Sequence, residues 1–587
     1  MVPPMEINPV ETEVLIIGGG LAGCMAGIKA KEHDVDVLIV EKAHTKSSGQ
    51  AGSGIDHIWG HFPPVHDKIG WTLDDLVEDH MQGVACGFAR RDLIRFMAGD
   101  MYDRLMDLER FGVRVRYEDS GLPGKFRMVH QFHSVPSSLN IDGRSLKVKL
   151  TREAKKRGVK IINRVMIIDL LVREGAVCGA MGVGTRNAAI YLFRAKSVIL
   201  CAGGKTGRMG RESTGSARFN LHLPGNLSAD GKAMALRAGL PIMNMEFLGA
   251  RRYGLANYET AGRPPGNTWQ PAAAIVNASG ETVVPKGSFP VWGDLENGRR
   301  IDAQETRRLW LKKGGITPQG MPTREDLLLG GPFFVDCTQG TEEEIRYVEW
   351  ALSHEGKCKQ LLRHLKEEGI DLRKDRLELG LGSREVGNLA ASGLVVDKNM
   401  ETGIRGLFAA GDEVGGAPFG ASPGAFTTGW LAGETAARHA NNSLQLLSDE
   451  HEKTEALRNR CAGMFAPGEG FTWCEVEDTL QNIMDTYCGD IKTGALLKRG
   501  LERIEYLRQQ PIKVSNTHEL GRALEVDSLI ENAEMIIRTS LARTETRKHP
   551  CGFYRADFPE QDDTEWYAFS TIALKNGAYK LSRLPLE

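Results

Sequence analysis

A glycine-rich turn near the start of the chain constrains the fold more than any other feature of the sequence. The stretch "VLIIGGGLAGCMAG" (residues 14–27) joins an apolar run to small residues with helical spacing. Residues 13–17 predict a short buried strand, and the residues from Leu21 onward predict a helix. Because glycine weakens regular structure, glycines clustered between a strand and a helix indicate a backbone that closely approaches a ligand.

The spacing of three glycines in this turn indicates the kind of ligand. Gly18, Gly20 and Gly23 follow the pattern G-x-G-x-x-G. The first glycine permits the turn, the second lets a pyrophosphate approach, and the third lets helix and strand pack closely. The helix then begins at Leu21 and Ala22, where free N–H groups are available to the anion.

A carboxylate follows where dinucleotide binding requires one. The stretch "VDVLIVEKA" predicts a second strand that ends at Glu41, about 20 residues after the glycines, where an acid can hold ribose hydroxyls. The alternative is a glycine-rich helix start with a surface glutamate. The full order of strand, turn, helix, strand and acid favours a dinucleotide-binding α/β domain.

Composition and charge exclude several classes of function. The chain has 587 residues, 41% hydrophobic and 26% charged, and a net charge of −2. It can therefore bury a large core, and its charge gives no reason to expect nucleic acid or anionic membranes as partners. No apolar stretch approaches the ~20 residues that span a bilayer. The N-terminus lacks the features of an export signal, so we expect a cytoplasmic protein.

The cysteines and histidines do not form a metal-binding pattern. Ten cysteines are scattered along the chain and no pair has C-x-x-C spacing, so an iron–sulfur cluster or structural zinc within this chain is not expected. "HQFH" (residues 130–133) offers two histidines without a carboxylate or cysteine set. We therefore expect no metal site.

Two later strand–turn segments indicate which dinucleotide is bound. "AKSVILCAGGKTG" ends in a turn with Ala202, Gly203 and Gly204, and "GIRGLFAAGDEVGG" ends in one with Gly411 and Asp412. Each segment alone is compatible with an ordinary turn at a strand end. Together with the first motif they resemble the three-part FAD site of the fumarate reductase, succinate dehydrogenase and L-aspartate oxidase flavoproteins.

The resemblance covers most of the chain. Residues 228–247 resemble the segment before the capping domain of that family, "GPFFVDC" the strand that closes this domain, and residues 542–566 the C-terminal stretch. "SSGQAGSGI", "GASPGAFTTGWLAGE" and "GFYRADFP" are similar to one branch, the alpha subunit of adenylylsulfate reductase. The resemblance implies further FAD contacts from Lys42, Ser48, Gly49, Gln50, Val165, Asp230, Ala425, Phe426 and Thr427.

The resemblance also implies an architecture: an α/β fold with a Rossmann-like FAD-binding domain, an inserted α+β capping domain and a C-terminal helical domain. We expect residues 1–215 and 378–445 to form the FAD-binding domain and residues 216–377 the capping domain. Residues 446–545 predict helices with apolar residues on one face. Residues 546–587 predict an irregular tail that begins with basic residues.

The loop after the second strand bears on how the flavin is attached. Fumarate reductases attach it to a histidine in this loop, which reads "EKAHTKSSGQAGSGID" here. The resemblance puts the attachment position near Ser48, so His44 is expected to be a solvated loop residue. We therefore expect non-covalent FAD.

The substrate residues of the relatives are not all present. Fumarate reductases hold a dicarboxylate with a histidine before a glycine pair and with a later arginine. The first matching region, "LGSREVGNLAASGLVVD", has no histidine, and Asn388 or Arg384 takes its place; the second, "GASPGAF", has no arginine. Because an unpaired buried charge is costly, succinate and fumarate are disfavoured. Adenylylsulfate loses support as well, since its reductase also uses a histidine near the first region.

Other residues are candidates for the catalytic site. Arg251, in "NMEFLGARRYG", follows a segment that leads to the flavin cleft in the family, and a bidentate contact from it would suit an anionic substrate. Its alternative role is a salt bridge between domains, and Arg384 is the next candidate. His57, in "GIDHIWGHFPPVH" with His61 and His66, is a candidate proton donor; its alternative role is structural.

These observations predict an FAD-dependent oxidoreductase subunit that passes electrons between a small, anionic substrate and a partner. The chain has no cluster motif and no second glycine fingerprint for NAD, so the resemblance implies a separate ferredoxin-like iron–sulfur subunit. One alternative is a stand-alone C=C reductase or oxidase of the same fold. Another is a non-catalytic flavin electron-transfer subunit of a larger redox complex.

Overall fold

The computed structural model describes most of the chain. The described residues are 2–118, 120–129, 137–210, 223–249, 253–255, 269, 272–284, 286, 330–354, 356–381, 385–386, 392–444, 450–547 and 552–586.

The glycine-rich turn follows a central strand of the largest sheet. Its strands are β1 (Ile7–Ile17), β2 (Val37–Glu41), β6 (Lys160–Asn163), β7 (Val165–Arg173), β8 (Ala176–Gly184), β9 (Ile190–Leu200) and β19 (Leu407–Ala409). β1 lies between β2 and β9 and is parallel to both. On its other side β9 pairs first with β8, antiparallel, and then with β19, parallel. Every residue of β2 is buried, as is typical of a parallel strand covered on both faces.

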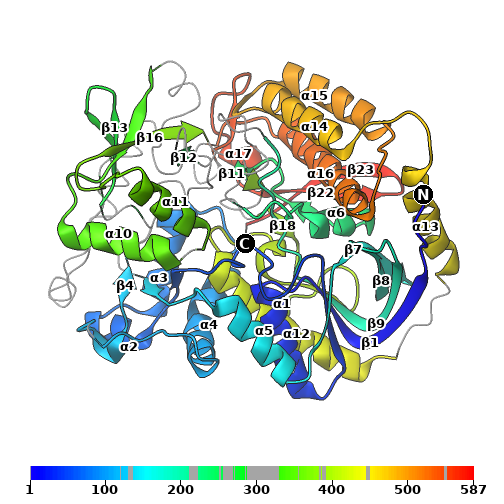
Figure 1. The fold of residues 1–587 in the computed structure, drawn as a ribbon, viewed down its shortest axis with the longest axis horizontal. Coiled ribbons are helices and arrows are strands. Elements are labelled where there is room, and N and C mark those ends of the chain that lie inside the picture. Colours follow the sequence, from blue (N-terminus) through cyan, green and yellow to red (C-terminus); the bar gives the residue numbers. More distant parts are fainter. Residues whose placement is uncertain are drawn as a thin grey trace.

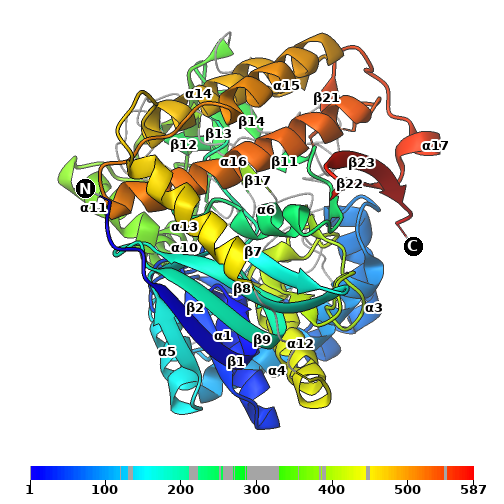
Figure 2. The ribbon, with the colours of Figure 1, turned by 90° about the vertical axis from the view of Figure 1, so that its right-hand side faces the viewer.

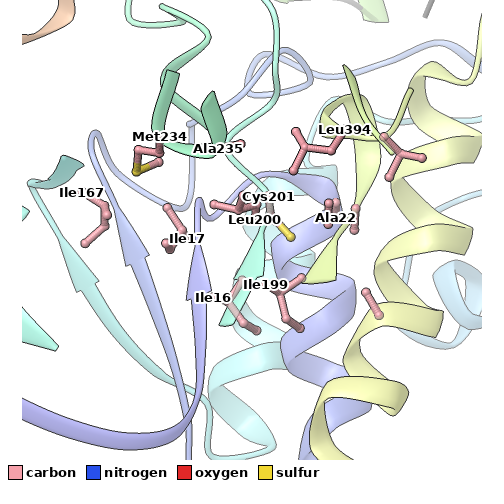
Figure 3. Packing of buried hydrophobic residues seen from close by; sticks show 14 of the residues in the cluster. Ile16, Ile17, Ala22, Ile167, Ile199, Leu200, Cys201, Met234, Ala235 and Leu394 are labelled. Carbon is pink, nitrogen blue, oxygen red and sulfur yellow. The ribbon is translucent and has the colours of Figure 1, made fainter. Parts of the chain in front are cut away.

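Two helices cover this sheet where the turn lies. They are α1 (Leu21–Ala30) and α12 (Ala421–Asn442), which lie side by side in Figure 1. A β-carbon at Gly429 would lie 2.6 Å from the Ala22 carbonyl oxygen, and one at Gly433 would overlap the Ala26 carbonyl oxygen. Glycine therefore permits the close approach of the two helices. Ile16 of β1, Ala22 of α1 and Ile199 of β9 belong to the same apolar core (Figure 3).

A separate antiparallel sheet has its own core. Its order is β12-β16-β15-β13-β14, with β12 (Tyr253–Leu255), β13 (Ala274–Asn277), β14 (Thr282–Val284), β15 (Phe333–Asp336) and β16 (Arg376–Leu381). Helices α10 (Glu342–His354) and α11 (Gly356–Glu367) accompany it, in green in Figure 1. Trp269, Val335 and Leu361 belong to this core, which is distinct from that of the main sheet. Residue 377, where we expect the capping segment to end, lies inside β16.

The predicted helical region is confirmed. It contains α13 (His451–Phe465), α14 (Trp473–Tyr487), α15 (Gly494–Arg508) and α16 (Thr517–Ala542). Figure 2 shows α14, α15 and α16 stacked over α6 (Asp230–Arg237). Leu480, Leu529 and Ile536 of these helices belong to the same core as the main sheet. The helical region is thus packed against the sheet rather than attached by a linker alone.

The expectation of an irregular tail is wrong. β22 (Phe569–Lys575) and β23 (Ala578–Leu584) form an antiparallel hairpin that extends a sheet with β10 (Ile242–Met243) and β18 (Gly393–Leu394). Asn576 and Gly577 connect the two strands with φ of 51° and 76°. Asn-Gly is the preferred pair for such a two-residue hairpin turn, so a hairpin signal was present in the sequence.

Further helices and strands complete the fold. They are α2 (Pro63–His66), α3 (Leu73–Asp79), α4 (Arg91–Arg110), α5 (Leu146–Lys156), α17 (Asp563–Trp566), β3 (His57–Trp59), β4 (Met128–Val129), β5 (Ser138–Asn140), β11 (Leu248–Gly249), β17 (Glu385–Val386), β20 (Ile491–Lys492) and β21 (Tyr554–Arg555). None of the described helices is both long and apolar enough to cross a lipid bilayer.

Candidate cofactor site

The turn between β1 and α1 is closely packed at Gly18 and Gly23 but open at Gly20. Gly18 adopts a φ of 104°, and a β-carbon there would overlap the Cys201 carbonyl oxygen at the end of β9. A β-carbon at Gly23 would overlap the Gly18 carbonyl oxygen, so α1 packs directly on the turn. At Gly20 a β-carbon would meet no atom within 4 Å. The backbone at Gly20 therefore faces open space, as the approach of a pyrophosphate requires.

The start of α1 and the end of β2 border this space. No side chain caps α1, so the N–H groups of its first turn are available to an anion. Glu41 is buried, and its carboxylate accepts hydrogen bonds from the N–H groups of Gly19 and Ala43, each at 2.7 Å. Each carboxylate oxygen has a further lone pair, which a ribose hydroxyl can use.

The loop after β2 returns to the same turn. The Ser48 hydroxyl is buried and donates to the Gly19 carbonyl oxygen at 3.3 Å. A β-carbon at Gly49 would lie 3.4 Å from the Gly20 Cα. His44 lies in the same loop, where its Nδ1 accepts a hydrogen bond from a backbone N–H two residues later, at 3.2 Å. The position expected for covalent attachment is thus next to the turn and is occupied by a serine.

The end of β19 meets α1 and α12 at the turn. Gly411 donates its N–H to the Thr428 hydroxyl of α12 at 2.8 Å. A β-carbon at Gly411 would lie 3.0 Å from Ala22 Cβ and 3.7 Å from Ala425 Cα. The first motif and the third are therefore in contact, although about 390 residues separate them in the sequence.

Two lysines contact acidic and amide side chains from other segments around the turn. The Lys205 Nζ lies 2.9 Å from Asp412 Oδ2 and 3.4 Å from Gln50 Oε1. The Lys42 Nζ lies 2.6 Å from Asp230 Oδ2, at the start of α6. These contacts join the loop after β2, the turn after β9, α6 and the end of β19.

A buried ion-pair network joins this site to the helical region. The Lys42 Nζ lies 3.0 Å from Glu525 Oε1 of α16, and Arg208 Nη1 lies 2.7 Å from Glu525 Oε2. Arg208 Nη2 also lies 2.5 Å from Glu477 Oε2 of α14. Burial lowers the pKa of Lys42, but the Asp230 and Glu525 carboxylates outweigh it and raise that pKa above its ordinary value. The network therefore favours a charged Lys42.

The structure gathers the predicted cofactor residues at the carboxyl ends of the parallel strands, where α/β sheets bind ligands. Those it gathers are Gly18, Gly20, Leu21, Ala22, Gly23, Glu41, Lys42, Ser48, Gly49, Gln50, Ala202, Gly203, Gly204, Asp230, Gly411, Asp412 and Ala425. Phe426 and Thr427 follow Ala425 in α12 and are buried. Val165 begins β7 and is buried. The open space at Gly20, the uncapped helix and the ribose-side carboxylate together fit FAD, while the role of each residue as an FAD contact stays a prediction.

Of the predicted catalytic residues, only His57 lies in the described part of the chain. The His57 Nδ1, at the start of β3, lies 2.8 Å from Oδ1 of the buried Asp56 carboxylate. His66 is buried, and its Nδ1 accepts a hydrogen bond from the Phe62 N–H at 2.9 Å; His61 Nε2 lies 3.2 Å from a backbone carbonyl oxygen. These contacts within their own loop indicate a structural role for His61 and His66.

Several predicted residues lie outside the described part of the chain. They are Arg251 and Arg384, the alternative Asn388, and the histidines of residues 130–133. In the described part, no group of three or more histidines, cysteines and acids is arranged to hold a metal ion.

Sequence reasoning missed three charged residues at the turn after β9. Lys205, Lys232 and Glu413 are all buried, and each contacts that turn or its neighbours. One signal was available: Lys205 directly follows the glycine pair, and Glu413 directly follows the predicted Asp412. Nothing in the sequence places Lys232 beside them.

Comparison with known families shows the family to which this chain belongs. Residues 13–320, more than half of the chain, match the model of the FAD binding domain. The chain belongs to the FAD-dependent flavoproteins. Residues 477–587 match the C-terminal region of fumarate reductase flavoproteins, so the resemblance to the fumarate reductase and succinate dehydrogenase superfamily is confirmed. The protein is an FAD-dependent oxidoreductase, and FAD is its cofactor.

Individual relatives match this chain over nearly its whole length. It is 27% identical to a fumarate reductase (CoM/CoB) subunit of Methanothermobacter marburgensis over 578 residues, which cover 95% of this chain and 96% of the relative. It is 22% identical to the succinate dehydrogenase flavoprotein subunit of Rickettsia bellii, with 94% and 91% covered.

Solved structures show the same fold. Adenylylsulfate reductase of Archaeoglobus fulgidus has a TM-score of 0.82 at 23% identity, with 99% of this chain and 96% of that chain covered. A chain of Escherichia coli quinol fumarate reductase has a TM-score of 0.74 at 18% identity, with 98% of this chain and 97% of that chain covered. The predicted α/β fold with a helical C-terminal region is confirmed.

Proposed function

We propose that this flavoprotein is part of an enzyme that passes electrons between a small, anionic substrate and a separate ferredoxin-like iron–sulfur protein. The observation that supports this most strongly is that the loop after β2, the turn after β9 and the end of β19 all meet the glycine-rich turn between β1 and α1, in a region suited to FAD. The described residues also hold no group of side chains arranged to bind a metal ion. Bound FAD supplies a two-electron redox centre. Electrons that leave it need a carrier that the described part of this chain does not contain.

The relatives support a role within a larger enzyme. The name of the Methanothermobacter marburgensis protein makes it one subunit of a fumarate reductase, and that of the Rickettsia bellii protein makes it a flavoprotein subunit. Both names describe parts of assemblies, and this chain covers more than nine-tenths of each relative. Its ten cysteines without C-x-x-C spacing also favour a cluster on another chain.

His57 is the proposed proton donor. The buried Asp56 carboxylate lies 2.8 Å from His57 Nδ1 and so orients the ring. Arg251 is the proposed anchor of the anionic substrate, with Arg384 as the next candidate, because a guanidinium can hold two anionic oxygens at once. We propose that the protein works in the cytoplasm with its FAD bound non-covalently.

An anaerobic substrate screen tests this function. The FAD-loaded protein is mixed with organic acids, enoyl compounds and sulfur anions, both oxidised and after reduction by dithionite, while the visible flavin absorbance is followed. We expect one of these classes to reduce the flavin or reoxidise it, and Arg251→Lys to slow that reaction. If no class reacts while small electron carriers do, the protein is an electron-transfer component without substrate chemistry. Full turnover between two small molecules alone would identify a stand-alone reductase or oxidase.

Co-purification tests the partner. Expressed with its neighbouring genes under anaerobic conditions, the protein is expected to co-purify with a small iron-rich protein. A stable, fully active flavoprotein without bound iron would contradict the proposed partner.

A further inference from the structure

Four charged residues surround the turn that follows β9. Lys205 and Lys232 are 1% and 0% exposed, which is rare because a buried ammonium loses its hydration. The two acids, Asp412 and Glu413, come from the single 3-10 turn Gly411–Glu413 after β19. The two lysines differ in what they contact, and this difference separates their roles.

Lys232 and Glu413 hold the turn itself. The Lys232 Nζ donates to the Gly204 carbonyl oxygen and, at 3.1 Å, to the Ser392 hydroxyl. Glu413 Oε1 accepts the Gly204 N–H at 3.1 Å. A β-carbon at Gly204 would overlap the Asp412 carbonyl oxygen. Both backbone polar groups of Gly204 are therefore bound, and the position of the turn is fixed.

Burial and mutual attraction act in opposite directions on Lys232 and Glu413. Burial lowers the pKa of Lys232 to about 8, against the attraction of Glu413 and Asp412. Burial likewise raises the pKa of Glu413 to about 7, and Asp230 and Asp412 raise it further, against the attraction of Lys232. Their hydrogen bonds to Gly204 indicate that Glu413 and Lys232 position the turn.

Lys205 is placed differently. Its Nζ contacts Asp412 Oδ2 at 2.9 Å and Gln50 Oε1 at 3.4 Å. Gln50 and Asp412 are predicted FAD contacts from two segments about 360 residues apart in the sequence. Lys205 thus bridges two sides of the site in which the cofactor binds, and it balances the negative charge of Asp412 there.

We propose that Lys205 stabilises the negative charge that reduction places on bound FAD, and so raises the reduction potential of the cofactor. Gain of two electrons and one proton leaves one additional negative charge on the cofactor, and charge near a flavin tunes its electronics. Without Lys205, the Asp412 carboxylate is left unbalanced and opposes reduction. This inference rests on FAD binding and is independent of the proposed substrate and iron–sulfur partner.

The variant Lys205→Gln tests the inference. Its flavin midpoint potential is measured by dithionite titration against a reference dye, and its affinity for oxidised FAD by fluorescence titration of the apoprotein. We expect the affinity for reduced FAD to fall about 10- to 100-fold more than that for oxidised FAD. For a two-electron couple this equals a potential about 30–60 mV lower. Lys205→Arg, which keeps the charge, is expected to restore most of the potential.

Lys492→Gln is the matched control. Lys492 is also buried, in β20, where its Nζ lies 5.2 Å from the centre of the Phe553 ring in the C-terminal region. Its loss is expected to leave the flavin potential unchanged. An unchanged potential in Lys205→Gln overturns the inference, and so does an equal loss of affinity for both redox forms. A folded Lys205→Gln protein that no longer binds oxidised FAD also overturns it, because Lys205 then serves binding alone. None of these measurements uses a substrate, so their outcome is separate from that of the substrate screen.

Discussion

The buried carboxylate of Glu525 is expected to hold the helical region against the FAD site. Its oxygens lie 3.0 Å from Lys42 Nζ and 2.7 and 2.8 Å from the guanidinium nitrogens of Arg208 and Arg522. All but Arg522 are largely buried. Glu525→Gln keeps the shape of the side chain but removes the charge that balances these cations. Breaking a buried ion pair in this way costs about 3–5 kcal/mol.

The pKa of Glu525 gives a second estimate of the free energy that the ion pairs contribute to stability. Burial raises it, but Lys42, Arg208 and Arg522 outweigh that effect and lower it from 4.5 to about 2. A shift of this size corresponds to roughly 3 kcal/mol of folding stability. Because the folded-state pKa is the lower one, this stability is present above the unfolded pKa of 4.5. It declines below that pH and is lost as the pH falls through about 2.

Urea unfolding of wild type and Glu525→Gln at neutral pH measures the effect. We expect the midpoint of the variant to be lower by the lost free energy divided by the slope of that energy against urea concentration, a slope that increases with chain size. The difference between the two proteins is expected to shrink by about 0.8 kcal/mol at about pH 4, since part of the carboxylate is then protonated in the unfolded wild-type chain.

A surface ion pair provides the control. Glu505 of α15 lies 3.1 Å from Arg538, but its side chain is 51% exposed. Glu505→Gln is expected to cost less than about 1 kcal/mol. If Glu525→Gln and Glu505→Gln unfold at the same urea concentration, the buried network does not hold the two regions together, and the reasoning from burial and charge is refuted.

Three further predictions concern the cofactor and the substrate. Acid precipitation is expected to release FAD from the purified protein, because Ser48 stands at the attachment position; flavin that stays with the denatured chain would contradict this. Glu41→Ala is expected to weaken FAD binding about 10- to 150-fold in a fluorescence titration, from roughly 1.5–3 kcal/mol of charge-assisted hydrogen bonds. An unchanged dissociation constant would show that Glu41 serves only the N–H groups of the turn. Arg251→Lys is expected to keep FAD and to lower kcat/KM by about 1–3 kcal/mol of transition-state stabilisation. Arg252→Lys is its control, and equal kinetics with lower thermal stability in both variants would identify an interdomain brace.

Much of the FAD site could be predicted from the sequence because its first part is local. The strand, turn and helix of residues 13–30 are adjacent in the chain, and hard-sphere contacts at Gly18 and Gly23 leave few residue types possible there. The helices between residues 451 and 542 were also predictable from the spacing of their apolar residues, although α16 is buried around most of its circumference and not on one face alone. The hairpin of the tail had a local signal as well, in Asn576 and Gly577.

The charged residues of the site could not be predicted in the same way. Gly204 meets Lys232 and Glu413, and Lys42 meets Glu525, across sequence separations of 28 to about 480 residues. No local pattern encodes such pairings, because the backbone path through the whole sheet and the helical region determines which side chains meet. Burial then determines their charge state, since a lysine or glutamate removed from water retains its charge only if its neighbours compensate for the lost hydration. Local sequence therefore specified the turn at which we predict the dinucleotide to bind, and the tertiary structure determined the charges that surround it.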